Sequence, residues 1–264
     1  MVPPVMEPLA SRRCFEIETR LKEICDIPVF HDDQHGTAII TGAAVINALK
    51  VAGKKIEDVK IVINGAGAAG ISIGKYLLDL GAKNVIWCDR KGVIVEGQEG
   101  INAAQAELPK ISNPNKVTGL LSDALVDADI FIGVSAPNIV SKDMIRSMAD
   151  KAIVFPLANP VPEISHDDAI EAGAYIVGTG SSKYPNQINN VLVFPGIFRG
   201  ALDAGAKDIN REMMIAASKA IAESIPEDKL SPENIIPLAF DESVHKKVAE
   251  KVAEAARASG VARK

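Results

Sequence analysis

Short apolar runs alternate along the chain with segments whose apolar positions recur at helical spacing. Bounded apolar runs of this length predict strands at residues 59–64, 85–89, 130–134, 153–158 and 175–178. The segments between them predict helices at 68–80, 103–111, 122–128, 142–149 and 167–172. Because the strands are almost continuously apolar, we expect both faces of their sheet to be covered. The alternation predicts an α/β fold, a doubly wound parallel sheet with flanking helices.

Both ends of the chain have helical patterns. Residues 12–27 and 37–51 form two predicted helices before the first strand, separated by Pro28 and a polar cluster. The tail predicts further helices at 198–204, 210–224 and 241–256. No repeat or low-complexity linker divides the chain. We therefore expect a first segment, residues 1–30, that carries one helix, and one domain, residues 31–264, with a helical tail.

Composition and charge narrow the class of protein. The 264 residues carry a formal net charge of −5 and show no basic block, so we expect no nucleic-acid partner. Three cysteines, Cys14, Cys25 and Cys88, fit neither a disulfide framework nor a zinc site and suggest reduced thiols. The start lacks the features of a signal peptide, and the longest apolar runs have strand length. We expect a cytoplasmic protein that does not span a membrane.

A glycine-rich turn carries the clearest candidate chemistry. The turn reads Gly65-Ala66-Gly67-Ala68-Ala69-Gly70 and fits G-x-G-x-x-G between a predicted strand and a predicted helix. In such a turn the first glycine permits the tight bend, the second lets a pyrophosphate approach, and the third lets the helix pack closely. The helix N-terminus then offers N–H groups to the phosphates. The turn predicts a Rossmann-like domain that binds NAD(P), with a tight βα turn of an unrelated protein as the alternative.

The acid that ends the second predicted strand bears on the choice of cofactor. Asp89 lies 89 − 70 = 19 residues after Gly70, near the separation of about 20 expected for an acid that binds the ribose. A carboxylate there favours NAD, because it would repel the 2′-phosphate of NADP. Arg90 and Lys91 follow directly and could pair with that phosphate, so NADP stays open.

Other polar residues follow the ends of predicted strands, where ligands of doubly wound sheets bind. Ser135 follows the strand 130–134, Asn159 follows the strand 153–158, and Asn189 and Asn190 precede a Phe-Pro-Gly sequence. Amides can bind a carboxamide or a carboxylate without adding charge. Each of these residues has an ordinary alternative as part of a turn.

Two adjacent acids, Asp32 and Asp33, precede the predicted helix 37–51. Carboxylates are preferred ligands of Mg²⁺ and Mn²⁺. An acid at this position can equally cap the helix, and chemistry alone favours the cap. A metal site would need a further acid nearby, for which Glu7 is a candidate.

Taken together, these motifs resemble the malic enzymes of the small prokaryotic type, over residues 13–225. The strings that carry the resemblance are Phe30-His31-Asp32-Asp33-Gln34-His35-Gly36-Thr37-Ala38, the glycine turn, Ala158-Asn159-Pro160-Val161-Pro162-Glu163, and residues 184–200, which read YPNQINNVLVFPGIFRG. That family oxidatively decarboxylates malate to pyruvate and CO₂ with NAD(P)⁺ and Mg²⁺ or Mn²⁺. The resemblance implies the same reaction, the same cofactors and a homodimer.

Roles for individual residues follow from this resemblance. It implies that Asp33 is a metal ligand, in place of the cap, with Asp32 as its neighbour. It implies that Asn159 and Asn190 contact the nicotinamide end and the substrate, with Asn189 beside them. Ala66 to Ala69 would lie along the pyrophosphate.

The sequence departs from the family pattern in two places. The family has Glu-Asp ahead of the first helix, whereas this chain has Glu7-Pro8, so Glu7 is the one candidate ligand there. The upstream domain that supplies the family's tyrosine acid and lysine base has no counterpart in this sequence, which makes residues 1–30 a remnant of it. Lys183 and Tyr184 do not match those positions, so no catalytic residue is assigned. We expect the isolated chain to bind NAD(H) and to turn malate over poorly.

Three alternatives remain at this point. The cofactor domain could serve another dehydrogenase, of the amino-acid or folate type. It could be a non-catalytic dinucleotide-binding module. It could also belong to a malolactic-type enzyme with the same residues but lactate as its product.

Overall fold

The computed structural model describes residues 14–263, and a six-stranded sheet lies at its centre. The strand order is β3-β2-β1-β4-β5-β6, and all neighbours are parallel except β3, which pairs antiparallel with β2. The strands are β1 (Lys60–Asn64), β2 (Asn84–Asp89), β3 (Gly92–Val93), β4 (Ile130–Gly133), β5 (Ile153–Pro156) and β6 (Ile176–Val177). The predicted doubly wound α/β fold is confirmed.

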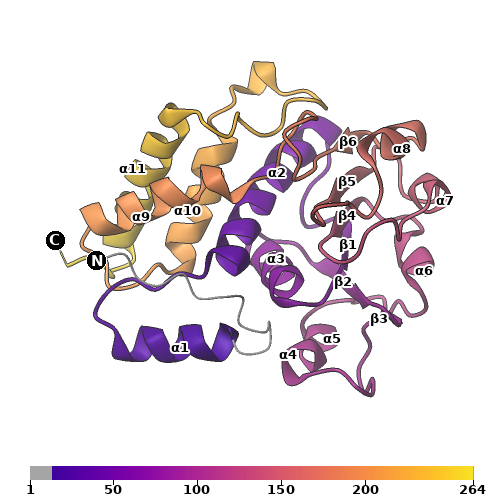
Figure 1. Ribbon diagram of the computed structural model, residues 1–264, viewed down its shortest axis with the longest axis horizontal. Coiled ribbons are helices and arrows are strands. Elements are labelled where there is room, and N and C mark those ends of the chain that lie inside the picture. The colour runs from indigo at the N-terminus through magenta and orange to yellow at the C-terminus, as the bar shows by residue number, and fades with distance from the viewer. Residues whose placement is uncertain (1–13, 264) are drawn as a thin grey trace.

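Helices cover both faces of the sheet (Figure 1). One face packs against α2 (Thr37–Ala52) and α3 (Ala68–Asp79), the other against α6 (Leu121–Leu125), α7 (Lys142–Arg146) and α8 (His166–Glu171). Alternate strand residues serve the two cores: Ile61 and Ile63 of β1 face the α2 side, whereas Val62 faces the α7 side. All three are fully buried, which explains the continuous apolar runs. Two short helices, α4 (Ala103–Ala106) and α5 (Leu108–Ile111), lie near the β2–β3 edge.

A second helical layer lies outside α2. It consists of α9 (Phe194–Asp203), α10 (Arg211–Ala222) and α11 (Glu242–Ala258). The hydroxyl of Tyr76 on α3 donates to the carbonyl of Met214 at 2.9 Å and so connects this layer to the sheet side. Residues 32–52 have the length and apolar composition of a membrane-crossing helix, but 72% of their most apolar stretch is buried inside the molecule. Such burial is typical of a core helix.

Some local structure differs from the prediction. The polar cluster before α2 is a π-helical turn, η1 (Asp32–Gly36), continuous with α2. A helix α1 (Cys14–Ile24) precedes it, and His35 donates to Glu18 of α1 at 2.7 Å. Two 3₁₀ turns, η2 (Asn190–Leu192) and η3 (Glu227–Lys229), complete the elements. The division of the chain at residue 30 stays a prediction.

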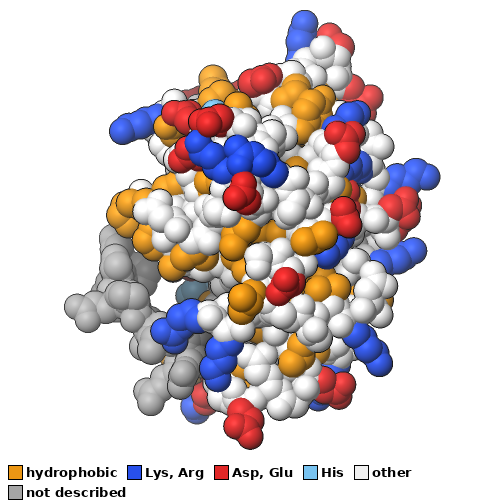
Figure 2. Space-filling model, turned by 90° about the vertical axis from the view of Figure 1, so that its right-hand side faces the viewer, with side chains coloured by type: hydrophobic (Ala, Val, Ile, Leu, Met, Phe, Trp, Pro, Cys, Tyr) orange, Lys and Arg blue, Asp and Glu red, His pale blue; other side chains and the backbone are white. Residues whose placement is uncertain are grey.

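The surface over α6, α7 and α8 carries charges of both signs. On this face lysine, arginine and acidic side chains are interspersed, and neither sign covers it (Figure 2). The expectation of no nucleic-acid partner stays a prediction.

Candidate functional site

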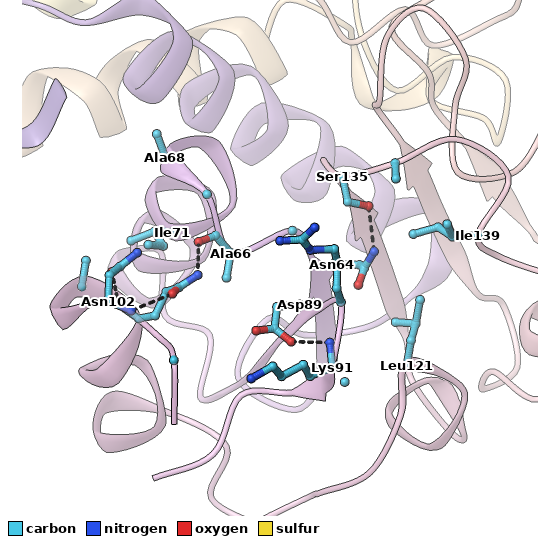
Figure 3. A pocket seen from close by; sticks show the side chains of 18 of the residues that line it. Asn64, Ala66, Ala68, Ile71, Asp89, Lys91, Asn102, Leu121, Ser135 and Ile139 are labelled. Carbon is cyan, nitrogen blue, oxygen red and sulfur yellow. Dashed lines mark hydrogen bonds between the residues drawn. The ribbon is translucent and has the colours of Figure 1, made fainter. Parts of the chain in front are cut away.

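A cleft opens where the chain changes direction across the sheet. After β1 the chain continues to β2 on one side, and β4 occupies the other side of β1. Ligands of doubly wound sheets bind at this point, outside the carboxyl ends of the strands. The cleft there has a volume of about 1080 Å³. It is lined by the glycine turn, the end of β2, α4 and the loop after β4 (Figure 3).

The three glycines of the turn have different surroundings. Gly65 has a φ of +114°, which a side chain would strain, and an added Cβ would lie 2.5 Å from the carbonyl oxygen of Val134. An added Cβ at Gly70 would overlap the carbonyl oxygen of Gly65. Gly67, by contrast, has ordinary extended backbone and no atom within 4 Å of its added Cβ. The turn and α3 require Gly65 and Gly70, whereas Gly67 faces open space.

Two carbonyl groups of this turn accept hydrogen bonds from side chains of the protein. Gln105 of α4 donates from Nε2 to the carbonyl of Ala66 at 2.9 Å, and Asn102 and Gln105 form the capping box of α4. The indole of Trp87 on β2 donates to the carbonyl of Gly70 at 2.9 Å. The N-cap of α3, Gly67, has no side-chain capping bond. Gly67 and Ala68 line the cleft, and no capping side chain occupies the first N–H groups of α3, as an anion site requires.

The end of β2 presents one carboxylate to the cleft. Asp89 accepts hydrogen bonds from the backbone N–H of Lys91 at 2.7 Å and from Gln98 at 3.3 Å. Among residues 14–263 it forms no ion pair, although Arg90 and Lys91 line the same cleft. The Lys91 ammonium donates to the carbonyl of Glu99 at 3.2 Å. The Asp89 carboxylate therefore lines the cleft without an ion-pair partner among the described residues.

A hydrogen-bonded polar chain joins the ends of β1, β4 and β5, with Asn64 and Glu163 buried and Ser135 exposed. Asn64 donates to the hydroxyl of Ser135 at 2.7 Å. The Ser135 hydroxyl and N–H donate to Glu163 Oε1 at 3.0 and 2.7 Å, and the N–H of Ala158 donates to Oε2 at 3.2 Å. Glu163 is fully buried. The predicted Ser135 thus lines the cleft with its one hydroxyl proton already donated to Glu163.

The acid pair lies at the start of the long helix, in contact with one predicted amide. Asn190 donates to the carboxylate of Asp32, and the other Asp32 oxygen is buried without a hydrogen-bond partner among the described residues. Burial, and then the neighbouring charge of Asp33, raise the pKa of Asp32 to about 6. Asp33 itself is exposed.

These acids form at most part of a cation site. Hard divalent cations take six or more oxygen ligands, and two adjacent carboxylates supply only some of them. Within residues 14–263 no group of three His, Cys, Asp or Glu side chains could hold a metal. Glu7, the other predicted ligand, lies outside the described residues. The described residues do not by themselves complete a metal site, and Asp33 as a ligand stays a prediction.

The predicted cofactor and substrate residues fall into two groups. Six line the cleft: Gly65, Ala66, Gly67, Ala68, Asp89 and Ser135. Ala69, Gly70, Asn159, Asn189 and Asn190 do not line it. Asn159 is exposed, beside Gly180, and the Asn189 side chain caps η2 by accepting from the N–H of Val191 at 3.0 Å. The structure therefore joins Asn190 to Asp32 but brings neither to the cleft wall, and the roles of the three asparagines stay predictions.

Three residues of the site were not predicted. Asn64 ends β1, a position that could have been noticed from the strand pattern. Glu163 stands in the string Ala158 to Glu163, but nothing in the sequence shows that its carboxylate is buried against Ser135. Gln105 lies 39 residues from Ala66, whose carbonyl it binds, and no pattern in the sequence predicts that contact.

Comparison with known proteins agrees with this geometry. A family model described as "Malic enzyme, NAD binding domain" matches residues 34–257. The chain is 54% identical over 259 residues to the "Bifunctional malic/malolactic enzyme" of Bacillus subtilis (strain 168), covering 98% of this chain and 63% of that protein. It is 51% identical over 259 residues to the "NAD-dependent malic enzyme" of Geobacillus stearothermophilus, covering 98% of this chain and 54% of that protein. The chain thus spans little more than half of each relative.

A solved structure shows the same fold. The crystal structure of the malic enzyme from Pyrococcus horikoshii Ot3 superposes with a TM-score of 0.92 at 45% identity, covering 97% of this chain and 61% of that one. The sequence match and the superposition both extend across the sheet, the glycine turn and the helical tail. The chain therefore belongs to the family of malic enzyme NAD-binding domains.

Proposed function

We propose that this chain binds a nicotinamide dinucleotide in the cleft, with the pyrophosphate against the turn from Gly65 to Gly70. The observation that carries the proposal is the open space in front of Gly67, at the start of a helix whose first N–H groups have no capping side chain. The nicotinamide half would lie toward the ends of β4 and β5, since the adenosine half takes the side of β2.

Within this proposal NAD is the preferred cofactor. The Asp89 carboxylate lines the cleft at the end of β2 and forms no ion pair among the described residues. A carboxylate at this position binds the ribose hydroxyls and repels a 2′-phosphate. Asp89→Asn should narrow the preference for NAD⁺ over NADP⁺. An equal affinity of the unmodified chain for both would contradict the assignment.

We further propose that the chain supplies the cofactor-binding part of an enzyme that oxidatively decarboxylates malate to pyruvate and CO₂. In that reaction bound NAD⁺ would accept hydride from C2 of malate. A divalent cation held by Asp33, with Glu7, would act as a Lewis acid. The chain's own residues would hold and orient the cofactor. No residue of this sequence is assigned as the base for the C2 hydroxyl or as the acid for C3. A homodimer in the cytoplasm is part of the same proposal.

The decisive experiment is a titration followed by an assay. Trp87 is the single tryptophan and lies under the glycine turn, so its fluorescence should report binding of NAD⁺ and NADP⁺. Unchanged fluorescence together with no heat in calorimetry would contradict dinucleotide binding. An assay with malate, NAD⁺ and Mn²⁺ should give little pyruvate from the isolated chain. Robust turnover would overturn that expectation, and lactate as the product would favour a malolactic reaction.

A further inference from the structure

We propose that Glu163 is a positioning residue for the nicotinamide half of the bound dinucleotide. Its buried carboxylate holds the loop after β4, through Ser135, and the loop after β5, through Ala158, in a fixed relation at the edge of the cleft. This inference rests on the proposed function, because it assigns the ends of β4 and β5 to the nicotinamide half.

Hydrogen-bond donors surround the Glu163 carboxylate. Three protein donors converge on it: the N–H and hydroxyl of Ser135, and the N–H of Ala158. A carboxylate is an acceptor at both oxygens, whereas a glutamine amide would turn an NH₂ group toward one of these donors. The site therefore suits a side chain that accepts hydrogen bonds at both terminal atoms, and not merely any polar side chain.

The end of β4 leaves space for the Glu163 carboxylate. An added Cβ at Gly133, the last residue of β4, would overlap the Glu163 carboxylate. The strand thus ends in a glycine where the acid is inserted. Among residues 14–263 Glu163 forms no ion pair, so hydrogen-bond donors alone satisfy its buried carboxylate. Burial of a polar group is costly unless donors satisfy it, and this carboxylate lies beside residues that line the cleft.

The Glu163 carboxylate is not the sole connection between the loop after β4 and the loop after β5. The loops are also joined by backbone hydrogen bonds, from the N–H of Asn138 to the carbonyl of Pro162 and from the N–H of Val140 to the carbonyl of Glu163, each at 3.0 Å. Loss of the carboxylate should therefore leave the loops attached. What it should change is the position of Ser135 and of the backbone next to Asn159.

The test compares two ligands that differ only at the nicotinamide. ADP-ribose keeps the groups that would contact the glycine turn and Asp89, and NAD⁺ adds the nicotinamide ring. Glu163→Gln should weaken NAD⁺ binding on the order of tenfold, the loss expected for one hydrogen bond to a charged group. It should leave ADP-ribose binding unchanged within about twofold, which corresponds to less than one neutral hydrogen bond. Calorimetry of the full chain with each ligand measures both.

A second test variant and a control variant accompany Glu163→Gln. Ser135→Ala removes one of the three donors and should reproduce the selective loss at smaller size. Asp129→Asn alters a carboxylate that joins β1 to the chain before β4 at the opposite end of these strands, and should change neither affinity. Equal affinities in Glu163→Gln and the unmodified chain would overturn the inference, as would an equal loss of both ligands. An unmodified chain that binds neither ligand would overturn the proposed function and this inference with it.

Discussion

The two edges of the same sheet handle a carboxylate in opposite ways. At the amino edge, Asp129 accepts from the N–H of Lys60 at 2.8 Å and pairs with the Lys54 ammonium at 2.7 Å. At the carboxyl edge, Glu163 is fully buried and Asp89 lines the cleft, yet neither forms an ion pair among the described residues. The amino edge thus neutralises its charge locally and serves stability. At the carboxyl edge, Asp89 lines an open cleft, and Glu163 is held by hydrogen-bond donors alone.

Replacing a glycine at each edge of the sheet should give the largest difference in stability between the two edges. Gly70→Ala should destabilise the fold by about 3 kcal/mol or more, because the added methyl overlaps the carbonyl of Gly65. Gly173, in the turn before β6, has a φ of +102° but no atom within 4 Å of an added Cβ. Gly173→Ala should therefore cost only about 1 kcal/mol of backbone strain. Urea unfolding measures both, and equal losses would contradict the assignment of close packing to Gly70.

A glycine of the same turn should separate binding from stability. Gly67→Ala places a methyl in the open space of the cleft, on backbone with a φ of −87° that any residue adopts. The melting temperature should stay unchanged, while the affinity for NAD⁺ falls by roughly tenfold or more, because the backbone can no longer approach the pyrophosphate. Unchanged affinity would show that the phosphates do not lie there.

The acid pair Asp32 and Asp33, at the start of the long helix, should destabilise the fold when no ligand is bound. Asp32→Asn removes a half-buried charge beside Asp33 and keeps an oxygen for the bond from Asn190. The melting temperature at neutral pH, without divalent cations, should rise by a few degrees. Asp33→Asn is the matched control; since Asp33 is exposed, its effect should be smaller. A lower melting temperature in Asp32→Asn would contradict this account.

The smallest effect concerns the acid that anchors α1, whose residue Glu16 lines the cleft. Burial raises the pKa of Glu18, but the hydrogen bond and charge of His35 and the charge of Lys22 outweigh this and hold the pKa below its usual 4.5. A lowered carboxyl pKa contributes stability above the unfolded-state value, and that stability is lost as the pH falls through the folded-state pKa.

Glu18→Gln should therefore weaken the protection of α1 against hydrogen exchange at neutral pH and flatten its loss below about pH 4.5. Lys110→Gln breaks an exposed pair with Glu107 and should leave α1 unchanged. A Glu18→Gln chain with the pH profile of the unmodified one would refute the anchoring role.

Much of the fold was predictable because local patterns carry it. Buried parallel strands are continuously apolar, and the glycine turn marks the change from β1 to α3. The strand β3 was missed, since two residues carry no period and its position depends on pairing with β2. The π-helical turn was missed because the polar residues from Asp32 to Gly36 resemble a loop.

The candidate site was predictable where one local motif forms it. The first four residues of the glycine turn, Gly65 to Ala68, and Asp89 line the same cleft, as their spacing indicated. Contacts between distant residues could not be foreseen: Asn190 and Asp32 are 158 positions apart, and Ser135 and Glu163 are 28 apart. Such pairs depend on how the loops at the carboxyl edge meet, which no single segment encodes.

A crystal structure of the chain with NAD⁺ would show whether the cleft binds the dinucleotide in the proposed way. We expect the pyrophosphate against the N–H groups that follow Gly67, the adenosine ribose within hydrogen-bond distance of Asp89, and the nicotinamide beside the Ser135 loop. A dinucleotide bound elsewhere, or one whose ribose lies away from Asp89, would contradict this expectation.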